Sequence, residues 1–228
     1  MADIRIVSRS AQPFNNRTEA GRLLGEALLE LKLKRPVVLG IPRGGVITAL
    51  AVSKVVGGEL DIVLARKLRA PFNPELAMGA ISESGQVFLD EKLVAALEVT
   101  PEYILQEKRT QTTEIERRLR LIRAVLPKVP LAGREVIVTD DGVATGSTMQ
   151  SALWATRQEK PTRLVCALPV APSETAERLA ESCDHLVLLR MPESFYAVGQ
   201  FYIRFDQIED EQVLDVLRHE AERRPARR

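Results

Sequence analysis

Residues 136–148 read Val136-Ile137-Val138-Thr139-Asp140-Asp141-Gly142-Val143-Ala144-Thr145-Gly146-Ser147-Thr148. The apolar residues at the start predict a strand that is buried on both faces of a parallel sheet. Two adjacent carboxylates, Asp140 and Asp141, follow the strand, and a loop of small residues then opens a predicted helix. Because ligands of open parallel sheets bind at the carboxyl ends of the strands, these residues are placed for function.

The loop between the carboxylates and the predicted helix has the composition of a phosphate-binding loop. Gly146 lets the backbone approach an anion closely. The N–H groups and the positive dipole end of the following helix favour a dianion, and three hydroxyl side chains add donors. The candidate cradle residues are Ala144, Thr145, Gly146, Ser147 and Thr148.

The two carboxylates would repel a phosphate, but they can accept hydrogen bonds from the two hydroxyls of a vicinal diol. Diol acceptors beside a monophosphate cradle predict a ribose 5-phosphate site. Either half alone would indicate an acidic strand end or an ordinary helix N-terminus. The sequence has no GxxxxGK[ST] and no GxGxxG after its first predicted strand, which disfavours a P-loop NTPase and a dinucleotide-binding fold.

The composition is that of an ordinary globular protein. Of 228 residues, 45% are hydrophobic and 28% charged, and 32 Lys and Arg nearly balance 31 Asp and Glu. This near-neutral charge predicts no general attraction to nucleic acid or to membranes. No secretory signal or membrane-spanning run is visible, and Cys166 and Cys183 fit no zinc or disulfide pattern. We therefore expect a single cytoplasmic domain over residues 1–228.

Outward from residues 136–148, short apolar runs alternate with amphipathic segments, which predicts an α/β fold. We expect an open, mostly parallel sheet flanked by helices. Strands are expected over 37–39, 61–65, 135–139, 164–168 and 186–189, and helices over 17–34, 46–56, 146–157, 173–181 and 209–222. The runs 77–81 and 86–89 predict a hairpin.

Residues 91–126 are predicted to be helical. Thr100 followed by Pro101 is typical of an N-cap and a first helical residue. The segment has one apolar stripe, and its charged residues are expected to face solvent. These charged residues are Glu114, Glu116, Arg117, Arg118 and Arg120.

The stretch with Asp140 and Asp141 resembles the motif with which type I phosphoribosyltransferases bind 5-phosphoribosyl-1-pyrophosphate (PRPP). The resemblance implies that fold, and transfer of the phosphoribosyl group to a nitrogen nucleophile, such as a nucleobase, with release of pyrophosphate. It implies that both aspartates hold the ribose and act in catalysis. It also implies Mg²⁺ as cofactor, carried by PRPP, with water-mediated contacts to the two aspartates as an option.

A second loop, Gly40-Ile41-Pro42-Arg43-Gly44-Gly45, follows the first predicted strand and resembles the pyrophosphate loop of the same family. The resemblance implies a catalytic role for Arg43 and PRPP binding by Gly44 and Gly45. It also implies a cis peptide bond on one side of Pro42. Without the other motif, this loop would be an ordinary turn between a strand and a helix.

The pair Arg66-Lys67 ends the second predicted strand and resembles a pair in orotate phosphoribosyltransferases, where the lysine reaches pyrophosphate. We therefore treat Lys67 as a candidate catalytic residue and Arg66 as a candidate PRPP ligand, with a solvated strand end as the alternative. The resemblance further implies that residues 69–85 form the mobile catalytic loop of the family.

The aromatic segment around Phe195 and Tyr196 is expected to belong to a hood, the small subdomain that holds the base in this family. Residues 190–228 and the N-terminal segment would form the hood, and either aromatic residue could stack on a base or pack on the core. Residues 91–127 exceed what the family core requires. They are expected to be a helical insertion that serves as an oligomer interface, a lid or a fused subdomain, and a homodimer is an option.

The acceptor base stays open. Hypoxanthine-guanine enzymes have an aspartate where this sequence has Ala144, whereas Arg43-Gly44-Gly45 resembles xanthine-guanine enzymes and Ala-Thr-Gly resembles adenine enzymes. Two other functions on the same fold are a PRPP-sensing regulator without catalysis and a hydrolase of PRPP or nucleotides. Neutral charge and the lack of an evident helix-turn-helix argue against the regulator.

Overall fold

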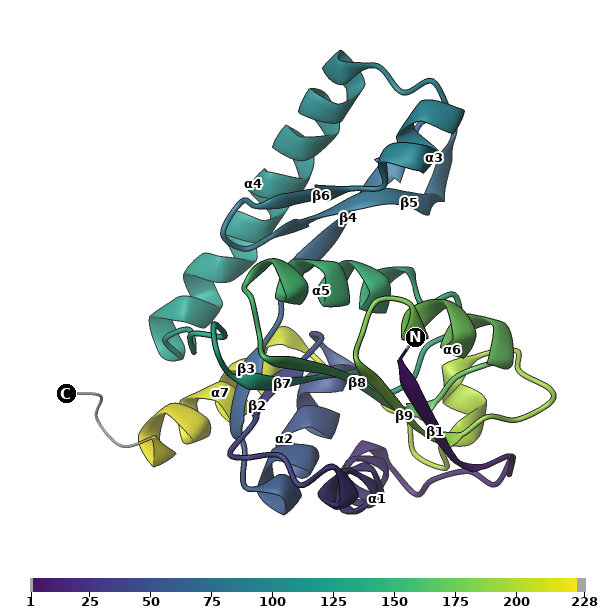
Figure 1. Cartoon of the computed structure of the whole chain (residues 1–228). Helices are drawn as coiled ribbons and strands as arrows, with labels where there is room; N and C mark the ends of the chain where they lie inside the picture. The colour runs from purple at the N-terminus through teal and green to yellow at the C-terminus, as the bar shows by residue number, and fades with distance from the viewer. Residues whose placement is uncertain (1, 225–228) are drawn as a thin grey trace.

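The computed structural model describes residues 2–224, the side chain of Glu75 excepted, and is built around a six-stranded sheet with the order β1-β9-β8-β7-β2-β3 (Figure 1). Every neighbouring pair in this sheet is parallel. The strands are β1 (Asp3–Ser8), β2 (Val37–Gly40), β3 (Glu59–Ile62), β7 (Glu135–Thr139), β8 (Arg163–Val170) and β9 (His185–Arg190). The predicted open, parallel α/β fold is confirmed.

Helices cover both faces of this sheet because its strands are apolar on both sides. In β7, Val136 and Val138 pack with the helices on one face, and Ile137 packs with those on the other. The first face carries α5 (Ser147–Gln158) and α6 (Ser173–Ala180), and the second carries α1 (Arg17–Leu28) and α2 (Gly44–Val56). A last helix, α7 (Asp210–Arg223), packs beside α2.

The first strand, β1, is absent from the strands that the sequence predicts. It pairs in parallel with β9 at the edge of the sheet. Its polar and apolar residues alternate, and the side chains of Ile4 and Val7 remain 44% and 49% exposed. A half-exposed edge strand lacks the continuous apolar run that marks the central strands, which is why the sequence pattern does not reveal it.

Residues 65–125 form a second unit, which we call the arm, and it stands over the α5 face of the sheet (Figure 1). Its antiparallel sheet has the order β4-β5-β6. Its elements are β4 (Ala65–Ala70), β5 (Asn73–Ser82), β6 (Val87–Leu89), α3 (Glu91–Ala96) and α4 (Pro101–Val125). The predicted hairpin and helical segment are confirmed, although the helical segment is two helices.

The expectation of an irregular loop over residues 69–85 is wrong, because most of this segment is β-strand, and its catalytic role stays a prediction. Asn73, Pro74 and Gly79 are residue types that favour a loop. Gly79 instead allows β6 to lie close, since a Cβ atom there would collide with the carbonyl oxygen of Phe88. Ala65, expected at the end of a core strand, begins β4.

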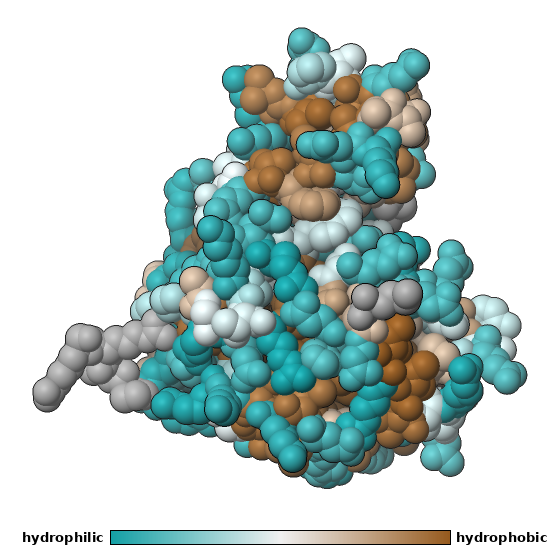
Figure 2. Space-filling model, viewed as in Figure 1, coloured by the Kyte–Doolittle hydropathy of each residue, from teal (hydrophilic) through white to brown (hydrophobic). Residues whose placement is uncertain are grey.

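The arm has its own apolar cluster and rests on the core. Leu68, Met78 and Ile115 are buried within it. The ring of Phe88 in β6 lies 4.4 Å from that of Trp154 in α5, measured between centroids. Apolar side chains also reach the arm's surface, as the brown areas over it in Figure 2 show. The arm is therefore a packed unit seated on α5.

Buried charges join the base of the arm to the sheet. Asp61 of β3 is 1% exposed and pairs with Arg123 of α4, with 2.7 Å between Oδ1 and Nη1. Arg123 also pairs with Glu83 at 2.8 Å, and Glu83 pairs with Lys128 at 2.8 Å. These ion pairs link α4 to the β5–β6 turn and to the core.

The first helix is shorter than the sequence predicts. The first helix ends at Leu28 and continues as a short 3-10 turn, Leu29–Leu31, rather than extending to residue 34. A left-handed Lys32 (φ 51°) closes that turn. Among residues 2–224, no helix is both long and apolar enough to cross a bilayer.

Candidate active site

Two loops begin side by side at the carboxyl end of the sheet. β2 and β7 are adjacent, and Gly40 at the end of β2 lies opposite Thr139 at the end of β7. The first loop contains Arg43, and the second contains Asp140 and Asp141. From β2 the chain continues to β3 on one side, and from β7 it continues to β8 on the other side. The two loops therefore diverge between β2 and β7. In open parallel sheets, ligands bind at such a switch point.

Gly44 and Gly45 bring the backbone of the β2 loop directly against the two carboxylates. A Cβ atom at Gly45 would lie 2.7 Å from Oδ1 of Asp140, and one at Gly44 would collide with Oδ2 of Asp141. Any larger residue at either position would displace a carboxylate. The two sequence motifs, one after β2 and one after β7, therefore form one candidate site.

Arg17, which the sequence analysis does not single out, contacts the acidic pair. Its Nε donates to Oδ2 of Asp141 at 2.6 Å, and its Nη1 donates to the carbonyl of Asp206 at 2.8 Å. Its guanidinium lies 3.8 Å from the centre of the Phe205 ring. Asn16 caps α1, so Arg17 is in the first turn, where a cation opposes the helix dipole. That placement is the signal that could have revealed it.

Burial makes the charged forms of Asp140 and Asp141 less favourable. Burial and the neighbouring charge of Asp141 raise the pKa of Asp140 well above its ordinary value. Burial also raises the pKa of Asp141, and Arg17 opposes this shift. The N–H of Asp141 donates to Oδ1 of Asp140 at 2.9 Å. A ligand whose hydroxyls donate to this pair would therefore replace hydrogen bonds that burial has removed.

Helix α6 fixes the loop after β7. Oγ1 of Thr175 donates to the carbonyl of Ala144 at 2.7 Å, and Arg178 donates to the carbonyl of Thr145. Gly146 is the N-cap of α5 with φ 70°, and a Cβ atom there would lie 2.6 Å from Cγ2 of Thr175. The N-terminal end of a helix attracts anions through its dipole and its backbone N–H groups, so the start of α5 is a candidate phosphate site. The first two residues of α5 are Ser147 and Thr148.

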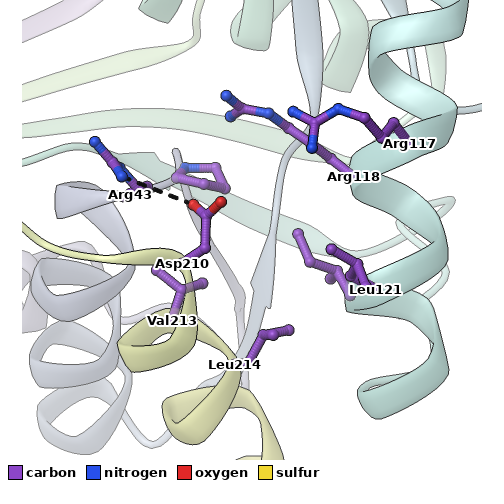
Figure 3. Close-up of a pocket in the computed structure, with 9 residues that line it drawn as sticks. Arg43, Arg117, Arg118, Leu121, Asp210, Val213 and Leu214 are labelled. Atoms are coloured by element: carbon purple, nitrogen blue, oxygen red, sulfur yellow. Dashed lines mark ion pairs between the residues drawn. The ribbon is translucent and has the colours of Figure 1, made fainter.

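Arg43 extends from the β2 loop toward the start of α7 (Figure 3). Its Nη1 lies 3.5 Å from Oε2 of Glu209 and 3.9 Å from Oδ1 of Asp210. These side chains are exposed enough that the pairs contribute little stability, so an anion can compete for Arg43. The peptide bond between Pro42 and Arg43 is cis, which is one of the two positions expected.

Arg66 and Lys67 lie on β4 at the base of the arm. Both line a cavity of about 150 Å³. Ile41 and Pro42 of the β2 loop and Thr148 of α5 line the same cavity. The structure therefore brings Arg66, Lys67 and the end of the predicted phosphate cradle to one space, whereas Arg43 lies outside its lining.

The two candidate base-stacking residues differ in their surroundings. Phe195 is half-buried and packs on Phe201, with 5.1 Å between ring centroids. Tyr196 is 88% exposed. Val198 of the same segment approaches the loop after β7, since its Cγ1 would lie 2.7 Å from a Cβ atom at Gly142. Phe195 therefore packs on the protein itself, and Tyr196 stays a candidate for stacking on a base.

Comparisons with known proteins agree with this geometry. The model of the phosphoribosyl transferase domain family matches residues 15–205. A Mycobacterium tuberculosis protein named "Putative phosphoribosyl transferase Rv0571c" is 39% identical over 204 residues, which are 90% of this chain and 46% of that protein. The crystal structure of TT1426 from Thermus thermophilus is 43% identical with a TM-score of 0.88, and the match covers 92% of this chain and 100% of that chain.

This chain belongs to the phosphoribosyl transferase domain family. It spans about half the length of the curated relatives that it matches.

Proposed function

We propose that this chain transfers the 5-phosphoribosyl group of PRPP to a nitrogen nucleophile, with a nucleobase as the expected acceptor, and releases pyrophosphate. The observation that carries the proposal is the close packing of Gly44 and Gly45 against Asp140 and Asp141. This packing sets the glycine-rich loop against the acidic pair, and the loop after β7 carries that acidic pair and leads into the start of α5. We assign the ribose to the acidic pair, the 5-phosphate to the start of α5 and the pyrophosphate to the glycine-rich loop.

The acidic pair and the cradle have separate roles in the proposed reaction. Asp140 and Asp141 accept hydrogen bonds from the ribose hydroxyls, and their negative charge stabilises an oxocarbenium-like transition state more than the ground state. The cradle at the start of α5 fixes the 5-phosphate and so orients the reacting carbon. Arg17 holds Asp141 in place and favours its charged form.

Arg43 and Lys67 are the proposed cations for the leaving pyrophosphate. The carboxylate oxygens of Asp140 and Asp141 are hard donors that suit Mg²⁺ held through water. Among the described residues, 2–224, no group of three or more His, Cys, Asp or Glu side chains is arranged to hold a metal. When bound with PRPP, Mg²⁺ would neutralise part of the pyrophosphate charge.

The direct test is a pyrophosphate-release assay with Mg-PRPP and a panel of nucleobases. We expect release that depends on one class of base. Release without any added acceptor would indicate a hydrolase instead. Tight PRPP binding with no release under any condition would indicate a PRPP-sensing protein.

We expect Mg-PRPP to raise the melting temperature of the protein. A ligand that binds only the native state stabilises it, by about 2.7 kcal/mol at a hundredfold excess over Kd. Thermal melts with and without millimolar Mg-PRPP measure this, and Mg²⁺ alone is the control. A melting temperature that does not move would contradict the proposed site.

Arg43→Ala is expected to weaken pyrophosphate binding about tenfold or more and to leave ribose 5-phosphate binding nearly unchanged. A hydrogen bond to a charged group contributes about 1.5–3 kcal/mol, and only pyrophosphate is expected to contact Arg43. Calorimetric titration with each ligand separately gives both affinities. Equal losses for the two ligands would mean that the β2 loop does not recognise pyrophosphate.

A further inference from the structure

The arm places a cation opposite the β2 loop. Arg118 of α4 lines the 150 Å³ cavity together with Arg66 and Lys67. It also lines a smaller hollow between α4 and α7, together with Arg43 and Pro42. Figure 3 shows Arg118 extending from α4 toward the side on which Arg43 lies. Arg118 therefore stands where the two hollows meet beside the β2 loop.

The position of Arg118 follows from the helical repeat of α4. Ile115 and Ile122, three residues before and four after it, are both buried. Residues at this spacing share a face of a helix, so Arg118 is on the inward face of α4. The expectation that the whole charged run faces solvent is wrong for Arg118, which is half-buried, and holds for Glu116 and Arg120, which are exposed.

Arg118 lacks a counter-charge in the part of the chain that the structure describes. No hydrogen bond or ion pair joins it to a carboxylate among those described side chains. The neighbouring acids are engaged elsewhere: Glu114 lies 3.8 Å from Arg117, and Glu107 accepts the backbone N–H of Arg69 at 3.2 Å. A half-buried guanidinium without a carboxylate is available to pair with an anion that enters the cavity.

Arg66 is fixed near Arg118 and experiences its charge. Nε of Arg66 donates to Oε1 of Gln111 at 2.9 Å, and Gln111 in turn donates to Glu107 at 2.9 Å. Gln111 is 1% exposed, so it holds Arg66 in one orientation. Burial and the charge of Arg118 lower the pKa of Arg66. Two guanidinium groups thus repel each other at a cavity that the β2 loop also lines.

The arm is anchored well enough to hold Arg118 in this position. Arg123, on the same helix, is tied to Asp61 of the sheet at 2.7 Å. The arm also rests on α5 through the rings of Phe88 and Trp154. The location of Arg118 relative to the β2 loop is therefore set by the folded arm, without a segment that must close.

We propose that Arg118 completes the pyrophosphate site from the side of the arm and binds the diphosphate group of PRPP together with Arg66. The planar guanidinium matches phosphate oxygens in a two-pronged arrangement, and its charge is relieved when the diphosphate enters. This inference rests on the proposed function. It makes α4 part of the binding site rather than a solvated insertion.

Calorimetric titration of wild-type and variant proteins with Mg-pyrophosphate and with ribose 5-phosphate tests the proposal. Arg118→Gln is expected to weaken pyrophosphate binding about tenfold to a hundredfold and to leave ribose 5-phosphate binding within about twofold. Arg120→Gln, on the exposed face of the same helix, is the matched control and is expected to match wild type with both ligands. Arg118→Lys keeps the charge but loses the planar fork, so its loss should be smaller.

Three other results would overturn either the role of Arg118 or the proposed function. A folded Arg118→Gln protein with unchanged pyrophosphate affinity, or with equal losses for both ligands, overturns the role of Arg118 alone. If Arg118→Gln does not fold, Arg118→Lys decides, and wild-type affinity for pyrophosphate in that variant overturns the role. Wild-type protein that binds neither ligand overturns the proposed function, and this inference with it.

Discussion

The double variant Asp140→Asn, Asp141→Asn is expected to fold normally, to bind PRPP more weakly and to lose turnover far more strongly. Asparagine keeps the size of the side chain and one acceptor oxygen but removes the charge. Loss of a charge that stabilises a transition state lowers kcat by roughly 10²–10³. The ground state loses less, because the ribose hydroxyls keep an acceptor, so the effect should appear mainly in kcat.

Stability measurements distinguish a ribose-binding role of the two aspartates from a purely structural one. The pKa of Asp140 is raised in the folded protein, so its charged form opposes folding at neutral pH. Asp140→Asn alone should therefore leave the unfolding free energy unchanged or raise it, whereas Asp141→Asn also weakens the ion pair with Arg17, so the stability test uses the Asp140 single variant. An acid that only caps the strand would instead lower the melting temperature when replaced and leave PRPP binding alone. Melting curves, PRPP titration and kcat of the same variant distinguish the two, and wild-type PRPP affinity in a folded variant would remove the ribose role.

Asp61→Ala is expected to lower the unfolding free energy by about 3–5 kcal/mol, as loss of one partner of a buried ion pair does. Oδ1 of Asp61 accepts from Arg123 at 2.7 Å, and Oδ2 accepts the backbone N–H of Val129 at 2.8 Å. Without Asp61, that N–H is buried without its partner, and Arg123 keeps Glu83 and the carbonyl of Leu126. Urea denaturation followed by circular dichroism measures the change.

Glu211→Ala is the control for this stability measurement. Glu211 pairs with Arg218 at 2.8 Å, but both side chains are exposed. Loss of such an exposed, solvent-screened pair is expected to change the stability little. If Asp61→Ala destabilises the protein no more than Glu211→Ala does, the buried charges do not anchor the arm to the sheet.

Structural features that are formed by consecutive residues can be predicted from the sequence. The central strands, the acidic pair, the loop that begins α5 and the glycine pair are all short continuous stretches. Arg17 is not predictable in this way, because its partner Asp141 is 124 positions away. The same holds for Arg118, whose surroundings depend on how the arm packs against the β2 loop.

The strands of the arm could not be predicted from the sequence for a different reason. Asn73, Pro74 and Gly79 are ordinary loop signals, and the resemblance to a family with a mobile loop supports that interpretation. Tertiary pairing of β4 with β5 and of β5 with β6 overrides these local preferences. Gly79 lets β6 lie close to β5. A single sequence does not reveal that close approach.

The contacts of the C-terminal aromatic segment set a limit on trimming this protein for expression. The hydroxyl of Tyr202 donates a hydrogen bond to the carbonyl of Asp141, and the carbonyl of Asp206 accepts from Arg17. The backbone N–H of Phe14 donates to the carbonyl of Phe201 at 2.8 Å, and the ring of Phe14 lies against that of Tyr202. A shortened fragment that ends before residue 206 or begins after residue 14 would therefore lose contacts that support the acidic pair, even if it kept every residue of the motif.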